Sequence, residues 1–179
     1  MCGIVGYIGN QKATPILLNG LSALEYRGYD SAGIAVLEKN NICILKDKGR
    51  VKNLYNIDGI NELSANIGIA HTRWATHGKP SKENAHPHSD NSNTFAVVHN
   101  GIIENFAVLK EFLINKGYTF YSETDTEIIP NLIHYYYNGD LFEAVAKTIE
   151  RLEGSYALGV ICGNEPDKIV AVRKDSPLI

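Results

Sequence analysis

The order of strand-like and helix-like segments most constrains the fold of this chain. Apolar segments with strand character occur at residues 2–8, 33–37, 42–46, 67–71, 94–99, 155–161 and 168–173. Apolar residues at helical spacing occur at 14–28, 104–116, 126–137 and 141–152. A doubly wound parallel sheet would need strands and helices in regular alternation, which this order lacks. It therefore predicts an α+β fold with largely antiparallel sheets.

Local signals refine this outline. The first strand, residues 2–8, has little polar content and is expected to be buried on both faces. Thr14 is expected to cap the helix that follows, with Pro15 at its first position. Residues 38–41 are expected to form a hairpin turn between two strands, and two short helical turns are expected within 51–63.

Charge and cysteine content narrow the function classes. The formal net charge of the 179 residues is −3, and acidic and basic residues are interspersed. Nucleic-acid binding would need a basic block, and a membrane span a long apolar run, so neither partner is expected. The three cysteines lack paired spacing, which favours a reducing, cytoplasmic setting. Because the chain ends on apolar residues, it is expected to be a fragment of a longer one.

The stretch from Thr72 to Asn93 is polar and rich in His, Pro, Ser and Asn. A loop of about twenty residues is uncommon in a compact domain unless it has a function. Histidines within and beside it raise the alternative of a metal site: His71, His77, His86, His88 and His99. No cysteine lies nearby and a single His-x-His is a weak signal, so no metal is expected.

Cys2 carries the chemistry of greatest interest. With Gly3 following it, removal of Met1 is expected, and this removal would leave a thiol and a free α-amine on adjacent carbons. Their ordinary pKa values, about 8.5 and about 7.7–8.0, allow the amine to take the thiol proton. Gly3 would let the backbone approach a substrate closely. Taken alone, a cysteine at this position is more often a small apolar residue of a buried strand.

Six motifs support the catalytic interpretation. They read MCGIVGYIG at the start, EYRGYDSAGIAV at 25–36, HTRWATHG at 71–78, NAHPH at 84–88, VVHNGIIEN at 97–105 and SETDTEII at 122–129. Together they closely resemble the glutaminase domain of the glucosamine-6-phosphate synthases, which are class II, N-terminal-nucleophile glutamine amidotransferases. The resemblance covers nearly the whole chain. It implies that residues 1–179 form one glutamine amidotransferase type 2 domain, folded as a four-layer αββα sandwich of two antiparallel sheets.

The resemblance assigns the oxyanion hole to the side-chain amide of Asn100 and the backbone N–H of Gly101. Both follow the predicted strand 94–99, so they are expected at a strand end. The alternative is an Asn-Gly hairpin turn. The predicted helix after Ile102 and Ile103 counts against that alternative.

Glutamine also presents a carboxylate and an ammonium. The resemblance implies that Arg73 binds the carboxylate, because its planar guanidinium group can bond to both oxygens. It implies that Asp125 binds the ammonium. Thr76 and His77 are expected to help hold the substrate, and Trp74 to form a pocket wall. The alternatives are a surface ion pair for Arg73 and Asp125, or a helix cap for Asp125.

Arg27 is expected beside Cys2, where a cation would favour the thiolate; a helix C-terminal cation is the alternative. The expected reaction is hydrolysis of L-glutamine through a Cys2 thioester, without a cofactor. Fructose 6-phosphate is expected as a partner only through a C-terminal sugar-isomerase region that this chain lacks, in a full-length homo-oligomer. Two other functions remain open: another class II amidotransferase or general N-terminal-cysteine amidase, and a non-catalytic glutamine-sensing module.

Overall fold

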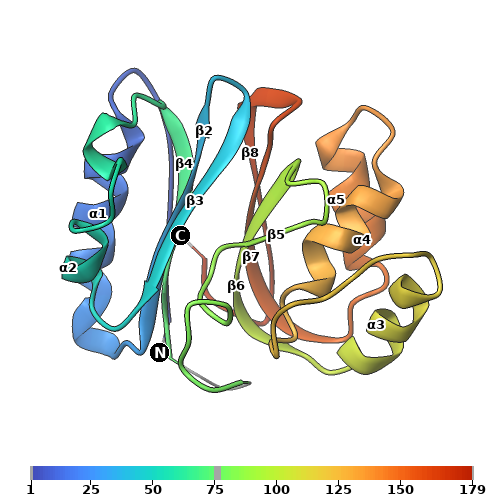
Figure 1. Ribbon diagram of the computed structural model, residues 1–179. Helices are drawn as coiled ribbons and strands as arrows, with labels where there is room; N and C mark the ends of the chain where they lie inside the picture. Colours follow the sequence, from blue (N-terminus) through green and yellow to red (C-terminus); the bar gives the residue numbers. More distant parts are fainter. Residues whose placement is uncertain (1, 75–77, 179) are drawn as a thin grey trace.

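Two antiparallel sheets face each other between two layers of helices in the computed structural model, which describes residues 2–74 and 78–178 (Figure 1). The first sheet has the order β1 (Gly3–Ile8), β4 (Ile67–Arg73), β2 (Ser31–Glu38), β3 (Asn41–Lys48). The second has the order β5 (His88–Ser89), β6 (Phe95–Ile103), β7 (Gly154–Cys162), β8 (Glu165–Lys174). All strand pairs within the two sheets are antiparallel.

Helices cover both outer faces. The first sheet carries α1 (Ala13–Leu24) and α2 (Val51–Leu54), and the second carries α3 (Phe106–Ile114), α4 (Ile128–Tyr136) and α5 (Leu141–Ile149) (Figure 1). Short 3₁₀ helices occupy Glu25–Arg27 and Ile60–Glu62. The predicted α+β class and the four-layer αββα arrangement are therefore confirmed.

Three apolar layers hold the sandwich together. Leu17, Leu21 and Ile34 are buried between α1 and the first sheet. Ile69 and Val98 are buried in the cluster between the two sheets. A larger cluster of buried residues joins the second sheet to α3–α5. Removal of this apolar surface from water is the main force that fixes the layers.

Several local predictions are confirmed. Lys39 and Asn40 form the turn between β2 and β3 with φ of 52° and 64°, as a two-residue hairpin turn with positive φ at both positions requires. Short helices lie within 51–63 as expected. The first long helix gives way to the 3₁₀ turn and stops at Gly28, whose φ is 106°.

Other details are corrected. β1 is partly exposed rather than buried on both faces, because it lies at the edge of its sheet. α1 begins at Ala13, with Lys12 as a cap residue that makes no side-chain cap hydrogen bond. Thr14 is instead buried within the helix. An edge position and a cap are both decided by tertiary packing, which local sequence patterns do not encode.

Within the polar stretch, residues 84–88 are buried and lead into β5. This segment crosses Gly33 of β2, where a Cβ would lie 2.3 Å from the His86 carbonyl oxygen. The Lys46 ammonium donates to the carbonyl oxygens of Glu83, Ala85 and Pro87 at 3.4, 2.6 and 3.0 Å. Burial lowers the pKa of Lys46 to about 8. One partly buried lysine thus fixes the backbone that carries His86.

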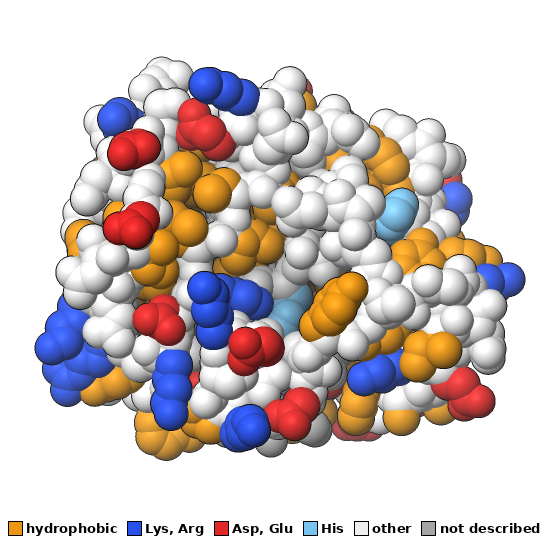
Figure 2. Space-filling model, viewed as in Figure 1, with side chains coloured by type: hydrophobic (Ala, Val, Ile, Leu, Met, Phe, Trp, Pro, Cys, Tyr) orange, Lys and Arg blue, Asp and Glu red, His pale blue; other side chains and the backbone are white. Residues whose placement is uncertain are grey.

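The surface has no dominant sign of charge on the face seen in Figure 2, where acidic and basic side chains are interspersed with apolar ones. Within the described ranges, every helix is too short or too polar to cross a bilayer.

Candidate active site

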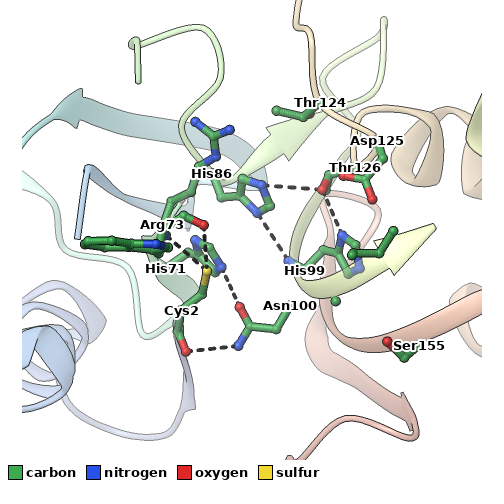
Figure 3. Close-up of a pocket in the computed structure, with 13 residues that line it drawn as sticks. Cys2, His71, Arg73, His86, His99, Asn100, Thr124, Asp125, Thr126 and Ser155 are labelled. Carbon is green, nitrogen blue, oxygen red and sulfur yellow. Dashed lines mark hydrogen bonds between the residues drawn. The ribbon is translucent and has the colours of Figure 1, made fainter. Parts of the chain in front are cut away.

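Cys2 lies directly before β1, beside a cavity of about 260 Å³ (Figure 3). Its Sγ accepts a hydrogen bond from the Trp74 backbone N–H at 3.1 Å and lies 3.5 Å from the Trp74 carbonyl oxygen. These contacts follow from the pairing of β1 with β4, in which Gly3 is opposite Thr72. A Cβ at Gly3 would lie 2.9 Å from both Leu24 and the Thr72 hydroxyl. Gly3 therefore provides room for chain packing.

Asn100 and Gly101 lie next to Cys2, inside β6. The expectation that they follow a strand end is corrected, because β6 continues to Ile103 through its pairing with β7. Asn100 Nδ2 donates to the Cys2 carbonyl oxygen at 3.3 Å. Gly101 has a φ of 126°, and a Cβ there would lie 2.0 Å from the Ser155 carbonyl oxygen. Only glycine fits this position.

Cys2, Asn100 and Gly101 also line a second cavity, of about 400 Å³. Its other walls include Arg27, at the end of the first 3₁₀ helix, and Ser176–Leu178 near the end of the chain. Arg27 thus lines a cavity that Cys2 also lines, and its expected role beside the nucleophile stays a prediction.

Arg73 and Asp125 line the first cavity together with Cys2. Arg73 is the last residue of β4 and is only 4% exposed, which excludes a surface ion pair. Its Nη2 donates to the Gly78 carbonyl oxygen at 3.0 Å, and its Nη1 lies 3.7 Å from Asp30 Oδ1. Asp125 accepts a hydrogen bond from the Ile103 backbone N–H at 2.8 Å.

The helix-cap alternative for Asp125 is wrong. α4 begins at Ile128, and its cap residue is Glu127, which makes no side-chain cap hydrogen bond. Asp125 is buried before that helix, is bonded to β6 and lines the cavity.

Trp74 forms part of the same cavity wall and is 55% exposed. Its indole packs directly on Gly28, where a Cβ would lie 2.7 Å from the ring. Two of the sequence motifs, 25–36 and 71–78, therefore meet at this contact. The predicted substrate contacts Thr76 and His77 lie outside the described residues.

Four buried histidines form a cluster at the cavity, and three of them line it: His71, His86 and His99. The rings of His71 and His86 stack with centroids 4.2 Å apart, and His88 and His99 lie farther along the cluster. Thr126 Oγ1 lies 2.8 Å from His99 Nδ1 and 3.4 Å from His86 Nε2. Among the described residues, no set of His, Cys, Asp and Glu side chains has the geometry of a metal site.

Burial keeps three of these imidazoles neutral. It lowers the pKa of His71 to about 3 and holds the pKa values of His86 and His88 well below the usual range. The sequence drew attention to the histidines only as a metal alternative. Their close spacing was the available signal, but the stacking depends on the path of residues 79–88.

Acid should destabilise the protein steeply because of this cluster. The unfolded histidines take up protons below about pH 6.5, whereas the folded ones do not, so stability falls as the pH falls. Each histidine contributes about 1.4 kcal/mol per pH unit in that window. The free energy of unfolding can be measured with urea at pH 7.5, 6.5, 5.5 and 5.0. Its slope against pH should be smaller in His88→Gln than in the parent by about 1.4 kcal/mol per pH unit. Equal slopes for the two proteins would contradict this account.

An αββα sandwich in which a cysteine directly precedes the first strand and lies beside an amide donor defines the class of N-terminal nucleophile amidohydrolases. A family model described as a glutamine amidotransferase domain matches residues 71–177. The chain therefore belongs to the glutamine amidotransferase domain family.

Two curated relatives from different bacteria share one enzyme name. The chain is 63% identical over 179 residues to a glutamine–fructose-6-phosphate aminotransferase (isomerizing) of Clostridium perfringens. This alignment covers all of this chain and 29% of the relative. It is 54% identical to the protein of that name in Aquifex aeolicus, again over the full chain and 30% of the relative. The chain thus spans less than a third of the length of these relatives.

Solved structures agree with the fold. Glutamine phosphoribosylpyrophosphate amidotransferase from B. subtilis superposes with a TM-score of 0.77 at 27% identity, over 91% of this chain and 35% of that one. A glutamine aminotransferase class-II domain protein from Silicibacter pomeroyi has a TM-score of 0.65 at 18% identity, over 100% of this chain and 79% of that one. The second likeness concerns the fold alone.

Proposed function

We propose that this chain hydrolyses L-glutamine to glutamate and ammonia through a thioester on Cys2. One observation carries the proposal: Cys2 Sγ, the Asn100 amide, the Arg73 guanidinium and the Asp125 carboxylate line one small cavity. It provides a nucleophile, an oxyanion donor, and groups of opposite charge for the α-carboxylate and α-ammonium of glutamine. The buried imidazoles of His71 and His86, which also line this cavity, add no charge.

The first half of the reaction forms the thioester. After Met1 is removed, the Cys2 α-amine takes the thiol proton, and the thiolate attacks the side-chain carbonyl carbon of glutamine. The Asn100 amide and the Gly101 N–H stabilise the resulting oxyanion, and each such donor contributes about 3–4 kcal/mol. The C–N bond then breaks, and ammonia leaves with the proton that the amine held.

The second half is hydrolysis. The free amine takes a proton from water as the water attacks the thioester carbonyl, and the tetrahedral intermediate again uses the same oxyanion donors. Collapse breaks the C–S bond, returns the thiol and releases glutamate. The net reaction consumes one glutamine and one water.

The relatives' name extends the proposal. In a longer protein of that kind, ammonia from this domain would pass to a sugar-isomerase region and yield glucosamine 6-phosphate from fructose 6-phosphate. Within that proposal, Thr76 and His77 contact glutamine and Arg27 orders the nucleophile. The longer protein would act as a cytoplasmic homo-oligomer.

Ammonia release tests the proposed function. Protein shown by intact mass to lack Met1 is incubated with L-glutamine, with L-asparagine and with butyramide. We expect ammonia from glutamine alone, because only glutamine satisfies both Arg73 and Asp125 while placing its amide at Cys2. Comparable release from butyramide would indicate a general amidase. Glutamine binding without any release would indicate a sensing module.

A further inference from the structure

The side-chain amide of Asn100 has one orientation that satisfies both of its neighbours. The Cys2 carbonyl oxygen can only accept a hydrogen bond, so the Asn100 atom 3.3 Å from it is the nitrogen, Nδ2. Oδ1 then points the opposite way, toward His71 Nε2 at 2.8 Å (Figure 3). For that contact to be a hydrogen bond, His71 Nε2 must carry the proton.

His71 is firmly held in this arrangement. It lies in β4, is 1% exposed, and stacks on His86 with an interplanar angle of 18°. His86 is in turn carried by the segment whose carbonyl groups accept from Lys46. Burial lowers the pKa of His71 to about 3, so the ring stays neutral at the pH at which the Cys2 amine is active.

We propose that His71 is a positioning residue for the oxyanion hole, because its Nε2–H fixes the Asn100 amide with Nδ2 on the side of Cys2, where the proposed reaction places the substrate carbonyl. This inference rests on the proposed glutaminase activity. Without the His71 donor, the amide could rotate and present Oδ1, which would repel a developing oxyanion instead of stabilising it. His71 therefore acts through Asn100 rather than on the substrate, and the loss should fall on kcat rather than on KM.

Two substitutions of similar length separate hydrogen bonding from packing. His71→Gln keeps an N–H donor at about the depth of Nε2, whereas His71→Met fills the space without one. We expect His71→Met to lower kcat for glutamine about 30- to 100-fold with KM within about threefold, since removal of a whole oxyanion donor costs about 10²–10³-fold. His71→Gln should recover kcat to within about fivefold of the parent. If His71→Met does not fold, His71→Leu takes its place.

A double substitution tests whether His71 acts through Asn100. In an Asn100→Ala background, His71→Met should lower kcat by no more than about threefold further, because the group it positions is gone. His88 is a matched control: it is equally buried, and its Nε2 bonds to Thr124 Oγ1 at 3.2 Å. His88→Met should lower the melting temperature as His71→Met does, with a much smaller fall in kcat.

Two results would overturn the inference: a kcat for His71→Met within threefold of the parent, or effects of His71→Met and Asn100→Ala that multiply. An inactive parent protein with Met1 removed would instead overturn the proposed function. All rates refer to protein whose fold is verified by circular dichroism.

Discussion

Cys2→Ala is expected to lower the rate of ammonia release from glutamine by at least about 10⁴-fold. Loss of the nucleophile removes the covalent route, and only the oxyanion donors and substrate binding remain to act on water. The substitution should leave the fold intact, because Cys2 is partly exposed and its backbone carbonyl contact with Asn100 is retained. Ammonia release and circular dichroism, measured on the same Met1-free preparations, check both parts.

Cys43→Ala provides the matched control. Cys43 is also partly buried, but it lies in β3, in the cluster between α1 and the first sheet. Its removal should cost some stability and leave the catalytic rate unchanged. A Cys2→Ala protein that kept a tenth of the parent rate would exclude Cys2 as the nucleophile.

Arg73→Ala is expected to lower kcat/KM for glutamine by about 10²–10³-fold, mostly through KM. Truncation of one partner of a buried charge pair typically costs about 2–5 kcal/mol, and here the substrate carboxylate would lose its partner. The kcat/KM of Arg73→Lys should lie between those of the parent and Arg73→Ala, since lysine keeps the positive charge but lacks the planar guanidinium group. Steady-state kinetics of all three proteins, each checked for folding because Asp30 also loses its ion pair, measure this effect.

Arg151→Ala is a suitable control, because Arg151 contacts Tyr136 on the helical layer that covers the second sheet. It should leave kcat/KM unchanged. An Arg73→Ala protein with kcat/KM within threefold of the parent would exclude Arg73 as the carboxylate partner.

Much of the fold was predictable because its signals are local. Alternation and helical spacing identify most strands and helices, and the 38–41 turn follows from the chemistry of its residues. Element ends were less predictable. β6 continues through Asn100–Gly101 to Ile103 because β7 supplies pairing partners up to Gly154, a long-range contact that no pattern within β6 encodes.

The candidate site likewise has a part that was predictable from the sequence and a part that depends on long-range contacts. The unusual chemistry of Cys2 was visible from the residue itself, and resemblance supplied Asn100, Arg73 and Asp125. The role inferred for His71 was not predictable, because it depends on a contact between β4 and β6 on opposite sheets. Lys46 likewise gave no signal. A lysine in a hairpin strand is ordinarily solvated, whereas Lys46 is partly buried and its ammonium donates to carbonyl oxygens of the 79–88 segment.

The central claim is that Cys2 provides both the nucleophile and the base, and the most direct test compares two forms of the same chain. One form has Met1 removed and the other retains it, as verified by intact mass, and ammonia release from glutamine is measured for each. The account predicts turnover by the Met1-free form and at least about 10³-fold less by the other, since an amide nitrogen cannot accept the thiol proton. Equal rates for the two forms would contradict it.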